Sequence, residues 1–459
     1  MLNLDTSHGV LLVICLAVAL GFEFVNGFHD TANAVATVIY TRSLRPWAAV
    51  IWSGVCNFAG VFLGGIAVAM SIIKLLPAEL LAMGGTGQGF AMILALLLGA
   101  ILWNVGTWYF GIPSSSSHTL IGSIIGVGLA HSLTPGHTFG SGVNWHKAGD
   151  VGLSLLISPM FGFSLAAILL VAALKLIPDP KLHEPVSGDK PPPGWIRAIL
   201  ITTCTGVSFA HGSNDGQKGV GLIMLILIAT MPGAFSVNRH LHGHKLEAVR
   251  AAIADVEALA AKSEAADRKK LSVELEAVRK AIEGKATLND VPEGERFALR
   301  KHVSSLDSAM GTLEKQSDVY GLVDLVKWKR SRSTIRSMID YAPSWVLIAV
   351  AFALGLGTMV GWKRIVVTIG EKIGKEHLSY AQGAAAEIVA MCTIGVSAVA
   401  GLPVSTTHVL SSGIAGTMVA KRSGLQPKTV RSIGLAWVLT LPVTMLLSGT
   451  LFLILRKLF

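Results

Sequence analysis

Two short stretches carry hydroxyl groups and a histidine inside otherwise apolar segments. SSSSHT, residues 114–119, follows Pro113, and VSTTH, residues 404–408, follows Pro403. Proline suits the first turn of a helix and disfavours helical geometry in the residue before it, so each stretch predicts a helix start. Unpaired backbone N–H groups at such a start, the positive end of the helix dipole and the hydroxyls together favour an anion. The chemistry indicated is the binding of a tetrahedral oxyanion.

Ionisable residues gather in a second pair of stretches, GFEFVNGFHDTANAV from Gly21 and GVSFAHGSNDGQKGV from Gly206. Charged groups in apolar surroundings are costly unless they are paired or functional. Carboxylate and amide oxygens on glycine-containing, interrupted helices suit a hard cation or a proton. The oxygen-bearing candidates are Asp30, Asp215, Asn26, Asn33 and Asn214, and the ionisable residues beside them are Glu23, His29, His211 and Lys218.

The elements that must position these residues are membrane-spanning helices. Of the 459 residues, 52% are hydrophobic and only 14% are charged, which excludes an ordinary soluble protein. Lipid offers no partners to backbone polar groups, so apolar spans of about 20 residues must be helical. The chain is therefore predicted to be an all-α polytopic membrane protein with apolar runs at 9–39, 47–76, 89–110, 151–176, 198–231, 345–360, 381–400 and 433–455.

Both pairs of stretches belong to an internal repeat. The ionisable stretch recurs after 185 residues and the hydroxyl stretch after 290. The difference of 105 residues matches the size of the polar segment 236–340, so the second half is predicted to be the first half with an inserted domain. Short loops rich in Lys and Arg differ between the halves in the way that an inverted repeat requires. With Arg42 and Arg45 placed inside, both termini and the insert are predicted to lie outside.

This repeat divides the chain into five predicted segments. They are a first membrane repeat at 1–177, a linker at 178–197, the start of a second repeat at 198–235, a soluble helical insert at 236–340 and the rest of the second repeat at 341–459. Apolar residues within 246–256 and 271–282 step by threes and fours, which predicts two amphipathic helices that break near Gly284. The insert is either a solvated helical cap or a module that binds a partner.

Several function classes are disfavoured. The formal charge of +10 lies mainly in short loops and the insert, where membrane topology and anionic lipid account for it, so no nucleic-acid partner is predicted. The four cysteines have no metal spacing, and no cofactor is predicted. A hydrolase using Ser115 and His118 would need one activated nucleophile and gives no reason for a second copy. We therefore predict that the protein is not an enzyme.

The motifs GFHDTANAVATVIYTR, HGSNDGQKG, PSSSSHTLIG and PVSTTHVLSS closely resemble those of the PiT family of inorganic phosphate transporters, in particular its bacterial low-affinity Pit permeases. The resemblance extends over both membrane halves. It implies an inverted-repeat fold with two re-entrant helical hairpins, a homodimer and phosphate uptake across the bacterial inner membrane.

The residue chemistry and the resemblance together assign roles to the candidate residues. Phosphate binding is predicted at Ser114, Ser115, Ser116, Ser117, Thr119, Ser405, Thr406 and Thr407. Binding of the coupling ion or proton is predicted at His29, Asp30, Asn33, Asn214, Asp215 and Lys218. Supporting roles are predicted for Glu23, Asn26, His118, His211 and His408.

One departure from the family pattern concerns the coupling ion. Sodium-coupled members have NDxAN in both halves, whereas this chain has HDTAN and NDGQK, with His29 and Lys218 in place of asparagines. The change weakens a sodium site and is similar to the proton-coupled bacterial branch, which is thought to carry phosphate as a neutral complex with a divalent metal such as Mg²⁺, Ca²⁺ or Zn²⁺. We predict proton symport, with Asp30 and Asp215 as candidate metal ligands. The alternatives are sodium symport, a carrier for arsenate or sulfate, and a non-transporting sensor.

Overall fold

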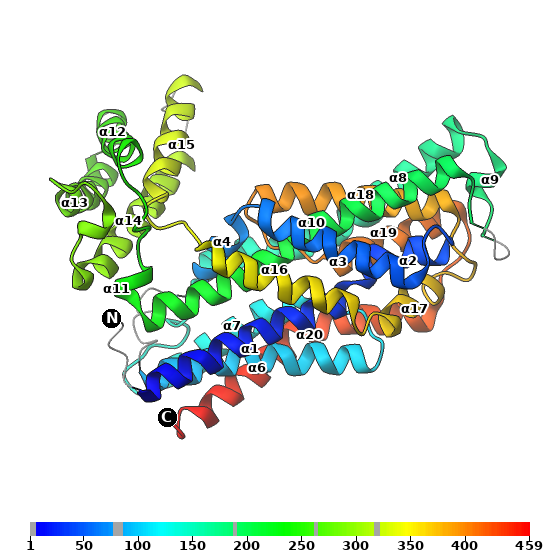
Figure 1. Ribbon diagram of the computed structural model, residues 1–459, viewed down its shortest axis with the longest axis horizontal. Helices are drawn as coiled ribbons and strands as arrows, with labels where there is room; N and C mark the ends of the chain where they lie inside the picture. Colours follow the sequence, from blue (N-terminus) through cyan, green and yellow to red (C-terminus); the bar gives the residue numbers. More distant parts are fainter. Residues whose placement is uncertain (1–5, 77–85, 187–190, 261–264, 316–321) are drawn as a thin grey trace. The chain divides into compact units, whose positions relative to one another are not determined.

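Apolar composition and the absence of lipid partners for the backbone lead to helices throughout. The computed structural model describes residues 6–76, 86–186, 191–260, 265–315 and 322–459. It is 79% helical and has no named strand among these residues, which confirms the predicted all-α class (Figure 1). The chain divides into two compact units, Met1–Ile226 with Pro343–Phe459, and Leu227–Ala342. The predicted insert, 236–340, falls inside the second unit.

The first unit contains the apolar helices. They are α1 (Thr6–Asp30), α2 (Ala32–Tyr40), α3 (Pro46–Leu63), α4 (Ala67–Ile73), α6 (Gly87–Tyr109), α7 (Ser116–Ser132), α8 (Trp145–Leu176), α9 (Pro180–His183), most of α10 (Gly194–Thr230), α16 (Ser344–Met359), α17 (Lys363–Glu371), α18 (Tyr380–Val399), α19 (Thr406–Lys421) and α20 (Pro427–Leu455).

Six spans in the described residues are long and apolar enough to cross a membrane, namely α1 continued by α2, α3, α6, α8, α18 and α20. The pair α16 and α17, bent by 64°, would make a seventh. The sequence predicted a further run at 198–231, which lies within α10 except for its last residue. It is not among the six because the polar residues of SNDGQK interrupt its apolar ones.

Two hairpins place α7 and α19. The chain turns after α6 at Gly111 and after α18 at Gly401, and these glycines have φ of 66° and 69°, a region that favours glycine. In each hairpin an extended segment through a proline then leads to the next helix. The two hairpins are therefore built alike, whereas the inverted orientation of the two halves stays a prediction.

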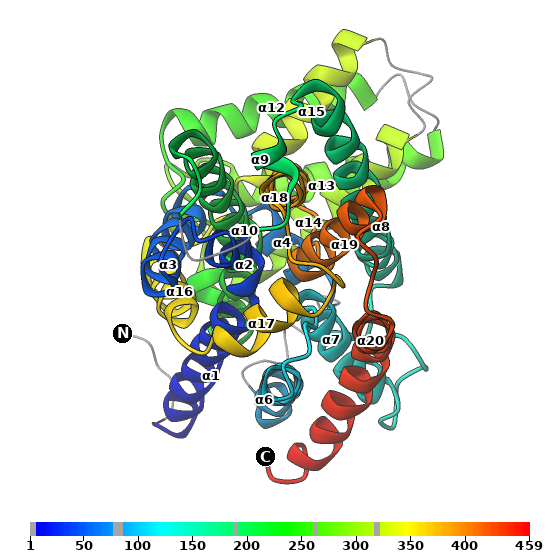
Figure 2. The ribbon, with the colours of Figure 1, turned by 90° about the vertical axis from the view of Figure 1, so that its right-hand side faces the viewer.

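Close backbone contacts hold each of these helices to a partner. Helix α7 lies beside α20, and α19 lies beside α8 (Figure 2). A Cβ added at Gly126 of α7 would lie 2.2 Å from the carbonyl oxygen of Met445, and one at Gly416 of α19 would lie 2.2 Å from that of Phe163. Small residues permit such approach, which is a main source of helix association in membranes.

Substitution of Gly416 by alanine is expected to destabilise the protein. The added methyl would meet backbone at 2.2 Å, and such overpacking costs roughly 1–3 kcal/mol. The Tm of the purified protein in detergent should fall accordingly. Gly395→Ala is the matched control, because nothing lies within 4 Å of a Cβ at that position. An equal Tm for both variants would contradict the close contact.

The second unit has a core of its own. It contains α11 (Pro232–Phe235), α12 (His244–Ala260), α13 (Ala265–Ile282), η1 (Leu288–Asp290), α14 (Glu293–Lys315) and α15 (Leu322–Arg336). Helix α12 packs on α15, and α13 packs on α14. Arg332 joins α15 to α14 through Asp307 at 2.7 Å and Glu314 at 2.8 Å. The predicted amphipathic positions are at most 3% exposed, namely Leu246, Val249, Ile253, Val256, Leu271, Leu275, Val278 and Ile282.

Candidate functional site

The two hydroxyl stretches form matching helix starts. Ser115 precedes α7 and accepts a hydrogen bond from the backbone N–H of His118 at 3.2 Å. Ser405 precedes α19 and accepts one from the backbone N–H of His408 at 3.1 Å. Serine is a preferred N-cap because its side-chain oxygen satisfies one of the unpaired N–H groups of the first turn. The other N–H groups of both first turns, and the positive dipole ends, favour an anion.

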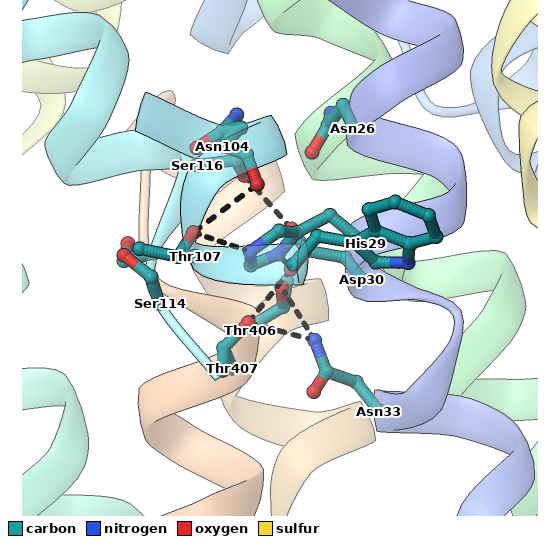
Figure 3. A network of polar contacts seen from close by, with 12 residues as sticks. Asn26, His29, Asp30, Asn33, Asn104, Thr107, Ser114, Ser116, Thr406 and Thr407 are labelled. Carbon is teal, nitrogen blue, oxygen red and sulfur yellow. Dashed lines mark hydrogen bonds and ion pairs between the residues drawn. The ribbon is translucent and has the colours of Figure 1, made fainter. Parts of the chain in front are cut away.

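Asp30 joins these two helix starts. The hydroxyl of Ser116, on α7, donates to Oδ2 of Asp30 at 2.8 Å, and the hydroxyl of Thr407, on α19, donates to Oδ1 at 2.8 Å (Figure 3). Asp30 is the last residue of α1, and the helix resumes after Thr31. The carboxylate lies in the interior of the unit, where it is 1% exposed.

His29 extends the same network toward α6. Its Nδ1 lies 3.1 Å from Oδ1 of Asp30, and its Nε2 lies 3.1 Å from the hydroxyl of Thr107. Because the two ring nitrogens contact different partners, the imidazole is fixed in position between them. His29 therefore connects the central carboxylate with α6.

Helix α10 contributes a buried ion pair. Nζ of Lys218 lies 2.6 Å from Oδ2 of Asp215 and 3.3 Å from the hydroxyl of Ser116. Both charged side chains are 0% exposed. Nε2 of His211 lies 3.4 Å from Asp215 and 3.9 Å from Asp30. The carboxylates and histidine thus meet at Ser116, and one ligand atom from each of Asp30, His211 and Asp215 lies within 4.8 Å of the others.

Two asparagines connect the ionisable stretches with the start of α19. Nδ2 of Asn33, on α2, donates to Thr407 at 3.0 Å and to Thr406 at 3.3 Å (Figure 3). Nδ2 of Asn214 donates to the carbonyl oxygen of Leu402 at 3.1 Å. The four predicted motifs therefore converge on one buried place that offers hydroxyl donors, carboxylates and one ammonium.

Similarity to known proteins identifies the family of this chain. The sequence profile described as "Phosphate transporter family" matches residues 26–448. The chain belongs to the phosphate transporter family. It is 44% identical to the low-affinity inorganic phosphate transporter PitA of Escherichia coli K12, over 98% of this chain and 97% of that protein. It is 28% identical to a probable low-affinity inorganic phosphate transporter of Bacillus subtilis, over 98% of both chains.

A solved structure shares the fold. The sodium-dependent phosphate transporter aligns with a TM-score of 0.56 at 19% identity, covering 98% of this chain and 100% of that one. The bacterial relatives and the apolar helices make this chain a multi-pass phosphate transporter of the bacterial inner membrane. They also confirm the prediction that it is not an enzyme.

Some predicted phosphate-binding residues of the transporter use their hydroxyls elsewhere. The hydroxyl of Ser114 lies 3.0 Å from that of Thr440 and accepts from Nε1 of Trp103 at 3.2 Å. Thr119 donates to the carbonyl oxygen of Ser115 within its own helix at 2.9 Å. The structure does not bring these two hydroxyls to Asp30.

Ser117 and the paired histidines connect the two halves of the transporter directly. The hydroxyl of Ser117 donates to the carbonyl oxygen of Val404 at 2.6 Å. The rings of His118 and His408 lie 4.6 Å apart, and His408 also stacks on Trp437 at 4.0 Å. The two hairpins are therefore in contact next to their helix starts, and these histidines belong to that contact.

Sequence reasoning missed several partners of the network. Thr107 contacts His29, and Asn57 contacts Nδ1 of His211 at 2.9 Å. Glu387, on α18, is 0% exposed and accepts hydrogen bonds from Thr37 and Thr203. A usable signal was present for Glu387, because it is an ionisable residue in the apolar run 381–400.

Proposed function

We propose that this transporter imports phosphate in symport with protons, as a neutral complex with a divalent metal ion. The observation that carries the proposal is the position of Lys218, whose ammonium lies 2.6 Å from Asp215. A sodium site needs several oxygen ligands around the ion, and a fixed ammonium beside one of those ligands repels a bare cation. A divalent metal that enters as a neutral complex carries the negative charge of phosphate with it, so the ammonium repels it far less. A proton can instead be taken up by a side chain without a coordination shell.

Phosphate would bind where the two helix starts meet. The hydroxyls of Ser116 and Thr407 already donate to a carboxylate at 2.8 Å, so their positions suit an oxyanion. Backbone N–H groups of α7 and α19 add donors and the positive ends of two helix dipoles. A tetrahedral ion can accept from both helices at once. Asp30 can in turn accept a hydrogen bond from a protonated phosphate oxygen, which sulfate cannot offer at neutral pH.

The transported metal would contact the carboxylate side of the site. Asp30, Asp215 and His211 bring one ligand atom each within 4.8 Å of one another. Oxygen and imidazole ligands suit Mg²⁺, Ca²⁺ and Zn²⁺ to different degrees, and phosphate oxygens would complete the shell. His29, Asp30, Asp215 and Lys218 are the proposed proton carriers.

Labelled phosphate uptake into proteoliposomes tests the proposal. Purified protein is reconstituted with and without sodium, with and without Mg²⁺, and with an imposed gradient that makes the inside alkaline. We expect uptake to follow the pH gradient, to rise with Mg²⁺ and to be unaffected by sodium. Strict dependence on sodium would contradict proton coupling, and uptake that ignores Mg²⁺ would contradict the metal complex.

Removal of the Ser116 hydroxyl is expected to weaken phosphate uptake. This hydroxyl contacts Asp30 and Lys218 at once, and loss of a hydrogen bond to a charged group costs about 1.5–3 kcal/mol, or about 10- to 150-fold in affinity. Ser116→Ala should raise the KM for phosphate by that factor. Ser158→Ala is the control, because Ser158 of α8 donates within its own helix. Equal KM values in the two variants would exclude Ser116 from the site.

Deletion of residues 240–335 tests whether the protein is a transporter or a non-transporting sensor. The second unit has its own buried core, whereas the residues of the proposed site all belong to the first. A chain with a short glycine-serine linker in place of 240–335 should keep measurable phosphate uptake when it is present in the membrane at the wild-type level. Complete loss of uptake by a correctly inserted chain would favour the sensor.

A further inference from the structure

Three buried side chains beside the site have polar atoms without a hydrogen-bond partner. They are Oε1 of Glu23, Oδ1 of Asn26 and both side-chain amide atoms of Asn104. Each of the three residues is 0% exposed. An unpaired buried polar atom costs about 1–3 kcal/mol, so a cluster of them is retained only where something else satisfies it.

Asn26 and Asn104 lie at the same level on two parallel helices. Helix α1 contacts α6 near both ends, with the rings of His8 and Phe90 at 5.9 Å and those of Phe28 and Trp108 at 5.0 Å. His29 meets Thr107 at 3.1 Å, and three residues earlier on each helix come Asn26 and Asn104. Figure 3 draws both asparagines on the same side of His29.

Glu23 lies on α1 one turn before Asn26. Its Oε2 accepts a hydrogen bond from Nδ2 of Asn26 at 3.4 Å. On its other side it packs on α10, where a Cβ at Gly219 would lie 2.2 Å from Cγ of Glu23. Gly219 follows Lys218 directly. The carboxyl therefore contacts Asn26 on one side and α10 on the other, at a place that only glycine leaves open.

The groups around Glu23 decide which cation it can take. Helix α16, packed against α1, has no titratable residue, and α6 has only Tyr109 at its last position. The remaining neighbours carry the other charged or titratable groups, namely Arg197, Cys204, His211, Asp215 and Lys218 on α10, His8, Cys15, His29 and Asp30 on α1, His118 and His131 on α7, and Tyr40 on α2. No ion pair joins Glu23 to any described residue. A metal ion would meet one carboxylate and the repulsion of Lys218, whereas a proton needs only one oxygen.

We infer that Glu23 binds a transported proton and that Asn26 holds the carboxyl in place. The inference rests on the proposed proton coupling and adds a residue to it. In the protonated form Oε1–H donates to the free amide oxygen of Asn26, which satisfies two of the unpaired atoms. On release the O–H bond breaks, the proton passes to water as hydronium, and the carboxylate that remains is stabilised by Lys218.

The test compares Glu23→Gln with wild type in proteoliposomes. Glutamine keeps the shape and neutrality of the protonated acid but cannot release a proton. We expect Glu23→Gln to keep exchange of labelled phosphate at equal pH on both sides and to lose accumulation driven by a pH gradient by about tenfold or more. Exchange by wild type should fall with rising pH, whereas exchange by the variant should not. Glu23→Asp should restore part of the accumulation, and Glu371→Gln, an exposed carboxyl on α17, should behave as wild type.

The outcomes separate the inference from the proposal on which it rests. If phosphate accumulation by the wild type does not depend on the pH gradient, proton coupling itself is wrong. If wild type accumulates phosphate and Glu23→Gln does so equally well, coupling stands and Glu23 is not its proton site. Loss of exchange together with accumulation would show that Glu23 is structural and would also overturn the inference.

Discussion

Replacement of Asp30 by asparagine is expected to lower phosphate uptake by about 100-fold, because one of two charge-assisted hydrogen bonds of about 1.5–3 kcal/mol is lost and the other is left with a neutral acceptor. The carboxylate accepts from Ser116 on one helix start and from Thr407 on the other, both at 2.8 Å. An asparagine can accept at one atom only. Initial rates of labelled uptake in proteoliposomes measure the effect.

The control for this change is Asp150→Asn, whose carboxylate on α8 is half-exposed. It should transport at the wild-type rate. Sulfate competition supplies a second readout, because the neutral amide no longer repels an unprotonated anion. Uptake near the wild-type level, or unchanged selectivity against sulfate, would remove Asp30 from the centre of the site.

Replacement of Lys218 by methionine is expected to have the largest effect on stability. The ammonium lies 2.6 Å from Asp215, and both side chains are 0% exposed. Removal of one partner of a buried pair leaves a buried charge without compensation and costs about 3–5 kcal/mol. The Tm in detergent should drop well below that of Lys175→Met, which alters an exposed lysine on α8. Phosphate uptake should fall as well.

A double variant, Asp215→Asn with Lys218→Met, separates the two effects. Without either charge the desolvation penalty disappears, so much of the lost Tm should return. Transport should not return, since the double variant lacks the Asp215 carboxylate as well as the Lys218 ammonium. Recovery of uptake together with Tm would mean that the pair acts only in folding.

Much of this fold could be predicted from apolar runs and from the internal repeat. The backbone must be helical in lipid, so length and composition located α1, α3, α6, α8, α18 and α20. The interrupted run 198–231 was harder, because the residues that carry chemistry lower its hydropathy. Helices α14 and α15 of the second unit were not predicted, since their polar faces hide the apolar positions that complete its core.

The sequence predicted which motifs form the site, but it could not predict which of their side chains contact one another. Repetition pointed to Asp30, Asp215 and the two hydroxyl stretches, and the structure brings them together. The sequence could not tell that Ser116 and Thr407 contact Asp30 while Ser114 faces Trp103 and Thr440. Neighbouring serines in an extended segment point in different directions, and that depends on tertiary packing. The partners Thr107 and Asn57 are single polar residues without a repeat to mark them.

The glycine contacts also have a mechanical consequence. Where Gly126 and Gly416 meet the backbone of Met445 and Phe163, no side chain is present to slide or rotate. Each pair, α7 with α20 and α19 with α8, should therefore move as a rigid body. A conformational change that opens a path for phosphate must then occur between these two helix pairs. They are joined there by hydrogen bonds that can break and re-form, around Asp30 and between Ser117 and Val404. The groups proposed to bind phosphate are therefore also the groups whose contacts must open and close during transport.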